Sequence, residues 1–367
     1  MRTFGVEEEF LLIDPRSLSP EPAADAVFLA ARGGVVTREC KQEQIETGTA
    51  PQTSLAELSA DILRCRTFAN EAASRAGVRI AALATSPTTT STSLTGDPRY
   101  LQMQERFGTT LRDQLTCGCH VHVGVKSDDE GVGVLDRIRV WLPVLSALST
   151  NSPFWNSEDS GYASYRSQAW SRWPTAGVYE TFGSAAAYHD LVEDLLATGV
   201  PIDEGQIYFD ARLSVRHPTV EVRVADVCLQ PDDAVLQAAL TRALVETAAR
   251  EWARGIAPIP MPAAQLRLAA WRASRFGLSG DLLDPQLNVL RDARQVARSL
   301  FEYVRPVLEE QEEELVVESL LRQTLLRGTG CHRQRTVYAR TGSLGAVISD
   351  AVFLTSAGPG AGYAMSA

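Results

Sequence analysis

The sequence lacks the common nucleotide-binding and nucleophile motifs. It contains no G-x-x-x-x-G-K-[ST] segment, no G-x-G-x-x-G after a predicted strand and no G-x-S-x-G turn. If the protein binds a nucleotide, it therefore does so without a Walker or a Rossmann design. Because the Ser and His residues form no recognisable triad, we also expect no covalent protein nucleophile.

Long apolar runs are also missing. The most apolar segment, VWLPVLSALSTNSPFW, contains two prolines and is too short to span a bilayer. The N-terminal MRTFGVEEEF places three acids where a signal peptide has its apolar core. Six cysteines are scattered without a secretory signal, so we expect reduced, mostly buried thiols in a cytoplasmic protein with no membrane partner.

Positive charge is in the minority. The 367 residues include 35 Lys and Arg against 45 Asp and Glu, a formal net charge of -10. This balance argues against nucleic acid or an anionic membrane as the main partner, and we expect small-molecule substrates. The rest of the composition, 45% hydrophobic and 22% charged, is typical of a globular protein. No sequence feature indicates an oligomeric state, and we take a homodimer as the expectation.

The stretch TCGCHVHVGV, residues 116–125, carries two cysteines and two histidines. Side chains alternate faces along a strand, so His120 and His122 point one way while Cys117 and Cys119 point the other. A Cys-Cys-His-His zinc site cannot be built from this segment alone, and Cys-x-Cys lacks the geometry of Cys-x-x-Cys redox proteins. We therefore expect the cysteines in the core and the histidines on a working face.

Charged side chains share one face in four further predicted strands, which carry Glu7, Glu9, Glu46, Asp210, Arg212, Glu221 and Arg223. Any one such strand is more often a half-exposed strand of an antiparallel sheet. In one sheet, however, the five strands would bring together a carboxylate cluster that is unfavourable without cations. Oxygen ligands with an imidazole favour Mg²⁺ or Mn²⁺ over zinc, and arginines beside them would hold carboxylates or phosphates. The residues alone predict a divalent-metal, phosphate-handling sheet surface.

The element pattern predicts an α+β fold with a largely antiparallel sheet. A capping box at Ser54 and Glu57 begins a helix that Gly77 ends. VLDRIRVWLPVLSALS reads as one buried helix, and 285–327 as a long helical segment whose acid run EEQEEEL is a solvated face. Because no linker divides the chain, we expect a single catalytic domain over 1–355 and a disordered tail over 356–367.

Several ordered stretches carry a resemblance to a known family: FGVEEEFLL, QIETGT, CGCHVHVGV, DSGYASYRS, YFDARLSVRHPTVEVRVADV and GTGCHRQR. They resemble the glutamate–cysteine ligase type 2 family of carboxylate–amine ligases over nearly the whole chain. More distantly, the pattern is similar to glutamine synthetase. The resemblance implies a curved, largely antiparallel sheet of the glutamine synthetase and guanidino kinase type. Helices would pack on its convex side, with ATP and metals on the concave face.

The resemblance also implies roles for individual residues. The implied ligands of Mg²⁺ (or Mn²⁺) are Glu7, Glu9, Glu46, His120 and Glu221. Arg223 is similar to the arginine that clamps the glutamate substrate or its developing phosphate, and His122 would lie near the phosphates of ATP; these two are the implied catalytic residues. Weaker candidates line the site: Arg212 and Arg335 towards ATP, and Arg166 and Asp210 towards the substrate.

The implied reaction is ATP-dependent formation of γ-glutamylcysteine from L-glutamate and L-cysteine through a γ-glutamyl phosphate, with release of ADP and phosphate. Two departures from the family bear on substrate choice: Thr85-Ser86-Pro87 replaces a Thr-His-Pro, and Leu213 replaces the proline of an Asp-x-Arg-Pro. Three alternatives stay open: a ligase or guanidino-type phosphotransferase for another amino acid or amine, a nucleotide-binding non-enzyme on the same fold, and a zinc protein.

Overall fold

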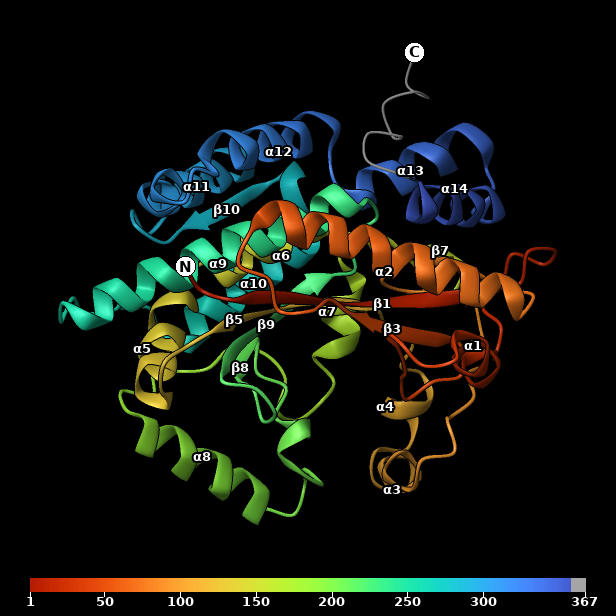
Figure 1. Cartoon of the computed structure of the whole chain (residues 1–367), viewed down its shortest axis with the longest axis horizontal. Coiled ribbons are helices and arrows are strands. Elements are labelled where there is room, and N and C mark those ends of the chain that lie inside the picture. The colour runs from red at the N-terminus through yellow and green to blue at the C-terminus, as the bar shows by residue number, and fades with distance from the viewer. Residues whose placement is uncertain (358–367) are drawn as a thin grey trace.

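A seven-stranded antiparallel sheet organises residues 1–357, the part of the chain that the computed structural model describes (Figure 1). Its strands run in the order β2-β3-β1-β5-β9-β8, and β4 pairs with β1. They are β1 (Phe4–Ile13), β2 (Val36–Arg38), β3 (Gln44–Gly48), β4 (Arg79–Ala81), β5 (Gly118–Gly124), β8 (Ala211–Leu213) and β9 (Thr219–Asp226). The prediction of an α+β fold with a largely antiparallel sheet is confirmed.

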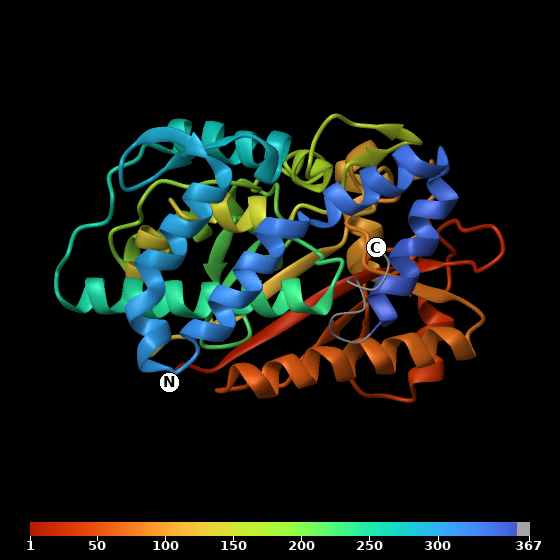
Figure 2. The same ribbon diagram turned by 90° about the horizontal axis from the view of Figure 1, so that it is seen from above.

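Most helices pack on one face of the sheet, the upper face in Figure 1. They are α2 (Leu55–Arg75), α6 (Leu142–Ser149), α9 (Pro231–Ala253), α10 (Ala263–Phe276), α11 (Ala293–Glu310), α12 (Glu314–Arg327), α13 (Gly330–Thr341) and α14 (Leu344–Ser356). Seen from above in Figure 2, α2, α9 and the C-terminal helices lie across the strands. The buried apolar residues of these helices and of the covered sheet face form most of the core.

Shorter elements border the other face of the sheet and its ends. They are α1 (Ala24–Ala31), α3 (Pro98–Phe107), α4 (Thr109–Arg112), α5 (Asp128–Ile138), α7 (Tyr165–Trp170), α8 (Ala185–Ala197) and the 3₁₀ turn Glu204–Gln206. The hairpin of β10 (Asp281–Asp284) with β11 (Val289–Asp292) and the 3₁₀ turn Gly277–Ser279 pack instead against α10 and α11, within the helical layer. The hairpin of β6 (Phe154–Trp155) with β7 (Glu158–Asp159) lies beside α13. In Figure 1, α8 and the α3–α4 pair stand on either side of the lower face. They form the walls around the working face described below.

Local sequence signals place α2 as expected. The hydroxyl of Ser54 accepts a hydrogen bond from the backbone N–H of Glu57, which satisfies one of the free N–H groups in the first turn. Gly77 follows the helix with φ +83°, a conformation that favours glycine. The predicted start and end of this helix are therefore confirmed.

Two helix predictions are wrong. VLDRIRVWLPVLSALS is not one helix but parts of α5 and α6, separated by a turn at 139–141, because Pro143 in the first turn of α6 has no N–H to continue a preceding helix. The segment 285–327 contains β11, α11 and α12, and Glu312 has φ +59° at the break between the two helices.

The acid run EEQEEEL is also not simply a solvated face. Glu313 is buried at the break between α11 and α12, where it forms an ion pair with Arg242 and accepts a hydrogen bond from the N–H of Leu55. The side chain thus fastens the α11–α12 corner to the start of α2 and to α9. The run could not reveal this, because the partners lie some 70 and 260 residues away in sequence.

Within residues 1–357, no helix is long and apolar enough to cross a membrane. The division into one domain over 1–355 and a tail stays a prediction. Residues 358–367, which make up nearly all of the expected disordered tail, lie outside the described part of the chain.

Candidate active site

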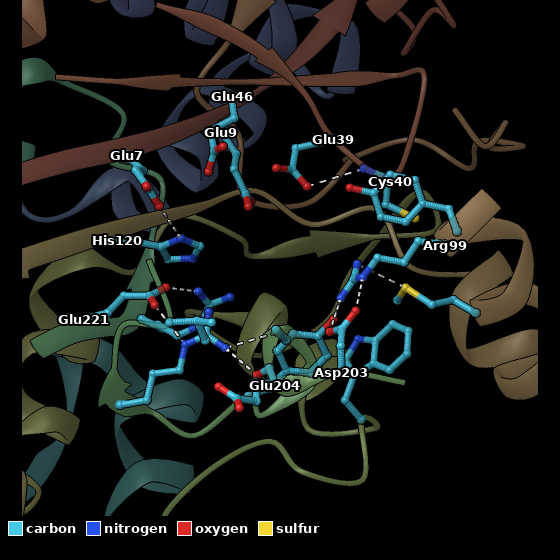
Figure 3. Close-up of a pocket in the computed structure, with 18 of the residues that line it drawn as sticks. Glu7, Glu9, Glu39, Cys40, Glu46, Arg99, His120, Asp203, Glu204 and Glu221 are labelled. Carbon is cyan, nitrogen blue, oxygen red and sulfur yellow. Dashed lines mark hydrogen bonds and ion pairs between the residues drawn. The ribbon is translucent and has the colours of Figure 1, made fainter. Parts of the chain in front are cut away.

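A cavity of about 980 Å³ lies on the face of the sheet opposite the helical layer. Side chains from β1, β3, β5, β8 and β9 form its floor. An ion pair forms part of its wall, where Arg99 of α3 holds Asp203 at 2.6 Å between Nε and Oδ2. Figure 3 shows that acidic side chains from several strands converge here.

Four glutamates form the most crowded part of this cavity. Glu7 and Glu9 come from β1, and Glu46 of β3 lies directly across from Glu9 in the strand pairing. Glu39 follows β2 and joins them, so that oxygens of Glu9, Glu39 and Glu46 lie within 4.8 Å of one another (Figure 3). The structure therefore places Glu7, Glu9 and Glu46 together, as the strand pattern predicted.

Sequence reasoning missed Glu39. It stands just outside a three-residue strand that periodicity does not reveal, next to Cys40 and Lys41. Its position depends on the pairing of β2 with β3, where Thr37 lies opposite Glu46. No local signal in the sequence distinguishes it from an ordinary acid near a strand end.

The crowding changes the protonation of these carboxyl groups. Burial, with the Glu9 carboxylate close by, raises the pKa of Glu39 to about 8. Burial together with Glu39, Glu7 and Glu9 raises the pKa of Glu46 well above its usual range. Within residues 1–357, no lysine or arginine forms an ion pair with Glu7, Glu9, Glu39 or Glu46. A cluster of oxygen donors without a protein cation fits a divalent metal ion.

The two histidines of β5 extend the cluster. His120 lies across from Glu7 in the strand pairing, with 3.6 Å between Nδ1 and Oε2, and Nε2 of His122 is 3.4 Å from the same oxygen. Burial and the nearby Arg223 lower the pKa of His120, which favours the neutral imidazole that metals bind. Cys117 and Cys119 are fully buried on the opposite face, so the predicted separation of cysteines and histidines is confirmed.

Two groups of possible ligand atoms include these histidines. One comprises Glu7, Glu46 and His120, and the other comprises Glu7, His122 and Glu221. Burial opposes ionisation of Glu7, but its interactions with His120 and His122 outweigh burial and lower its pKa. The Glu7 carboxylate is thus held ionised between the two histidines and belongs to both groups.

Glu221 differs from the other acids because it forms ion pairs with two arginines. Oε2 accepts a hydrogen bond from Nε of Arg212 at 2.8 Å, and Oε1 is paired with Arg223. Although burial favours the neutral acid, Arg223 and Arg212 hold the pKa of Glu221 well below its usual range. One end of the cavity is therefore rich in free carboxylates, and the other end presents two guanidinium groups.

Not all predicted residues lie in this cavity. Asp210 and Arg166 line a smaller cavity next to it, which Arg223 also lines. The prediction that Asp210 and Arg212 share a regular strand is wrong for Asp210. Only β8 (Ala211–Leu213) is regular, because Asp210 turns aside and its N–H donates to the carbonyl of Gly177.

The expectation for Arg335 needs correction. This residue lines neither cavity, and its guanidinium instead pairs with Asp159 of the β6–β7 hairpin, with 2.6 Å between Nη2 and Oδ1. Nη2 also donates to the carbonyl of Tyr162. The sequence around Arg335 did not indicate which part of the protein this side chain of α13 would contact.

Comparisons with known proteins point to one family. A sequence model of the glutamate–cysteine ligase family 2 (GCS2) matches residues 3–350. A Streptomyces avermitilis protein provisionally named glutamate–cysteine ligase 2-1 is 50% identical over 357 residues, 96% of this chain and 99% of that protein. A protein of Streptomyces coelicolor, provisionally named glutamate–cysteine ligase 2, is 48% identical over 97% of this chain and all of its own length.

Solved structures share the fold at much lower identity. A glutamate–cysteine ligase of Francisella tularensis, solved in complex with AMP, superposes with a TM-score of 0.70 at 14% identity and covers 96% of this chain and 88% of its own. The ligase PafA, solved with the ubiquitin-like protein Pup, gives a TM-score of 0.54 at 13% identity over 95% and 72% of the two chains. At these identities the likeness establishes the fold alone.

Proposed function

The chain belongs to the glutamate–cysteine ligase family 2, and from this premise we propose that it is an ATP-dependent ligase that joins L-glutamate to L-cysteine. The family and its relatives are glutamate–cysteine ligase-like carboxylate–amine ligases. One observation carries the proposal: Glu7, Glu9, Glu39 and Glu46 converge without a protein cation beside the paired Arg212 and Arg223. That arrangement suits a metal-bound triphosphate beside a carboxylate.

The acidic end of the cavity is the proposed metal site. Glu7, Glu9, Glu46, Glu221 and His120 would hold Mg²⁺ or Mn²⁺, and Glu39 joins this set on the basis of the structure. When bound, such ions neutralise phosphate charge and orient the nucleotide. Because Glu221 already receives two arginines, its share in holding a metal would be smaller than that of the four free glutamates.

The basic end of the cavity is the proposed site of acyl transfer. Arg223 would hold the glutamate carboxylate and then the phosphate formed on it, while Arg212 and His122 would face the phosphates of ATP. Arg223 is pre-oriented for this role, because its pairing with Glu221 fixes the guanidinium before substrate arrives. His122 is likewise held by Thr219, whose hydroxyl lies 3.0 Å from Nδ1.

The proposed reaction has two steps. The γ-carboxylate oxygen of glutamate attacks the γ-phosphorus of ATP, and the bond to ADP breaks. The amine of cysteine then attacks the carbonyl carbon of the acyl phosphate; the amide bond forms, phosphate leaves and the amine loses a proton. Phosphate is a far better leaving group than a carboxylate oxygen, so positioning and charge neutralisation suffice and no protein nucleophile is needed.

Product analysis tests the proposal. The protein is incubated with ATP, MgCl₂, L-glutamate and L-cysteine; ADP is measured by a coupled assay and the products by mass spectrometry. We expect ADP release that requires both amino acids, and a product with the mass of γ-glutamylcysteine. A screen over other carboxylates and amines follows the same readout and identifies better substrate pairs.

Two results would contradict the proposal. A stable phosphorylated amino acid or guanidine without an amide would indicate a phosphotransferase. Absence of ADP release across the whole panel, from protein whose folding is verified by circular dichroism, would indicate a nucleotide-binding protein without ligase activity. Glu46→Gln serves as the matched inactive control, because it changes one atom of one carboxyl group in the crowded cluster.

A further inference from the structure

A buried carboxylate lies at the end of β9, three residues after Arg223. Asp226 is the last residue of this strand and is 1% exposed. Residues 222–225 of β9 lie opposite residues 119–121 of β5, so β9 contains one extra residue, a bulge. Because of the bulge, Asp226 pairs with Gly118 and faces the same side of the sheet as Arg223, whereas strict alternation would have separated the two.

The Asp226 carboxylate fixes the loop that leads into α7. Its Oδ2 accepts hydrogen bonds from the backbone N–H of Asn151 at 2.8 Å and from the hydroxyl of Ser152 at 2.7 Å. Its Oδ1 accepts from the hydroxyl of Ser164, the N-cap residue of α7, at 2.8 Å. The Ser152 oxygen in turn accepts from the backbone N–H of Arg166. One carboxylate therefore holds both ends of this loop and the first turn of α7.

Arg166 links this carboxylate to the backbone of Arg223. It lines the second cavity, of about 430 Å³, which shares Arg223 with the main cavity. The Arg166 side chain is buried, with 4.0 Å between Nη1 and Oδ1 of Asp226, and its Nη2 donates to the Arg223 carbonyl at 3.3 Å. The guanidinium has room there because Gly118 has no side chain: a Cβ would collide with Nη2.

Trp170, at the other end of α7, forms a second link. The guanidinium groups of Arg166 and Arg223 lie 5.8 Å and 5.9 Å from the centroid of its ring, within cation–π distance. The Nε atoms of both arginines are buried and have no hydrogen-bond partner among residues 1–357. Each arginine thus keeps one donor for a ligand, and the direction of that donor depends on where α7 lies.

We propose that Asp226 is a positioning residue for the ligation, which holds α7 in place and thereby fixes the orientation of Arg223. Arg166 and Trp170 transmit the effect. Asp226 lines neither cavity, so it acts on the reaction only through these side chains. A carboxylate suits this purpose because it accepts several hydrogen bonds at once. The inference rests on the proposed function for the reaction, but the attachment of α7 can be measured without turnover.

Steady-state kinetics with ATP, MgCl₂, L-glutamate and L-cysteine test the role in catalysis. Asp226→Asn keeps the shape of the side chain but replaces one acceptor oxygen by an NH₂ group. We expect kcat to fall roughly 10- to 100-fold, with the KM for ATP within about twofold of the wild-type value. If Asp226 acts through Arg166, the double variant Asp226→Asn with Arg166→Ala loses clearly less than the product of the two single losses.

Asp284→Asn is the matched control for a purely structural carboxylate. Asp284 is also 1% exposed, accepts a hydrogen bond from Ser299 and pairs with Arg291, but it lines neither cavity. This variant should keep kcat within about twofold of the wild type. Hydrogen–deuterium exchange of the same proteins measures the attachment of α7: Asp226→Asn should speed exchange in residues 162–171 roughly 10-fold, and Asp284→Asn should not.

Ser152→Ala keeps the test open if Asp226→Asn fails to fold. It removes only the hydroxyl that joins the Asp226 carboxylate to the backbone N–H of Arg166. We expect a smaller loss of the same kind, roughly 3- to 10-fold in kcat, with faster exchange in residues 162–171.

The outcomes separate this inference from the proposed function. If the wild type releases no ADP, faster exchange of α7 in Asp226→Asn or Ser152→Ala supports the attachment and overturns only the ligase proposal, while unchanged exchange overturns both. If the wild type does form the amide, three results overturn the positioning role. They are a normal kcat in the variants, losses that multiply in the double variant, and an equal loss in Asp284→Asn.

Discussion

Three successive glutamates of β1 lie on two faces of the strand, and the surroundings of the two faces differ. Glu8 points into the helical core and is 2% exposed, and Arg66 of α2 binds it with two hydrogen bonds, 2.6 Å from Nη2 and 2.9 Å from Nε. Glu7 and Glu9 point into the main cavity, where no lysine or arginine of residues 1–357 pairs with them. Neighbours in sequence thus have entirely different partners.

This difference shows which carboxylates are neutralised by other residues of the chain. A carboxylate sealed in the core must be paired by the protein, because nothing else can reach it. Arg66 meets this demand, and its guanidinium also donates to the carbonyls of Cys228 and Leu229. On the open face, burial and neighbouring carboxylates instead raise the pKa of Glu39 and Glu46, so these groups hold protons unless a ligand supplies positive charge.

The largest effect is expected on the core face. Arg66→Ala leaves Glu8 buried without its partner and should lower the free energy of unfolding by about 3–5 kcal/mol. Chemical unfolding followed by circular dichroism measures it. Arg75→Ala on the same helix is the matched control, because its pair with Glu71 is exposed and spans 3.9 Å; it should cost less than about 1 kcal/mol. Equal losses in the two variants would remove the distinction between the faces.

On the open face, neutralising a carboxylate should raise the free energy of unfolding instead of lowering it. Glu46→Gln relieves repulsion and, without divalent cations at pH 8, should raise the free energy of unfolding by about 1 kcal/mol. The same variant should lose Mg²⁺-dependent ADP release about 100-fold. Glu8→Gln, measured beside it, should be destabilised. A destabilised Glu46→Gln that keeps its activity would contradict the proposed role of the cluster.

The pH dependence of stability gives a smaller, directional test. The pKa of Glu39 is raised in the folded state to about 8, so its contribution to stability is fully present below its ordinary pKa and is lost as pH rises through 8. Without divalent cations, the unfolding midpoint of the wild type should therefore fall more between pH 6 and pH 8.5 than that of Glu39→Gln. Parallel curves for the two proteins would show that Glu39 is not in a crowded carboxylate environment.

The smallest effect is expected outside both faces. Arg335 pairs with Asp159 at the surface, so Arg335→Ala should change the free energy of unfolding by less than about 1 kcal/mol. Because the residue lines neither cavity, the KM for ATP should stay within about twofold of the wild-type value. A large rise in the KM for ATP would instead restore the sequence-based expectation that Arg335 binds the nucleotide.

Strand alternation predicted much of the placement of side chains. It put Glu7 and Glu9 on one face of β1 and separated His120 from Cys119 on β5. It could not name the partner of Glu8, because Arg66 belongs to a helix 58 residues away whose orientation depends on packing.

The positions of residues outside regular, periodic strands could not be predicted from the sequence. Glu39 follows a strand that is too short for periodicity to reveal. Asp210 was assigned to a regular strand, but its contact with Gly177 turns it into the second cavity. In each case a tertiary contact, rather than local pattern, decides where the side chain lies.

Titration with Mn²⁺, with the free ion followed by electron paramagnetic resonance, tests the central claim most directly. A divalent cation among the open-face glutamates would explain why no arginine pairs with Glu7, Glu9, Glu39 or Glu46 in the described part of the chain. Wild-type protein should bind Mn²⁺ saturably, and the double variant Glu7→Gln with Glu46→Gln, shown to be folded by circular dichroism, should lose that binding. Equal binding by both proteins, or no binding by the wild type, would contradict the account.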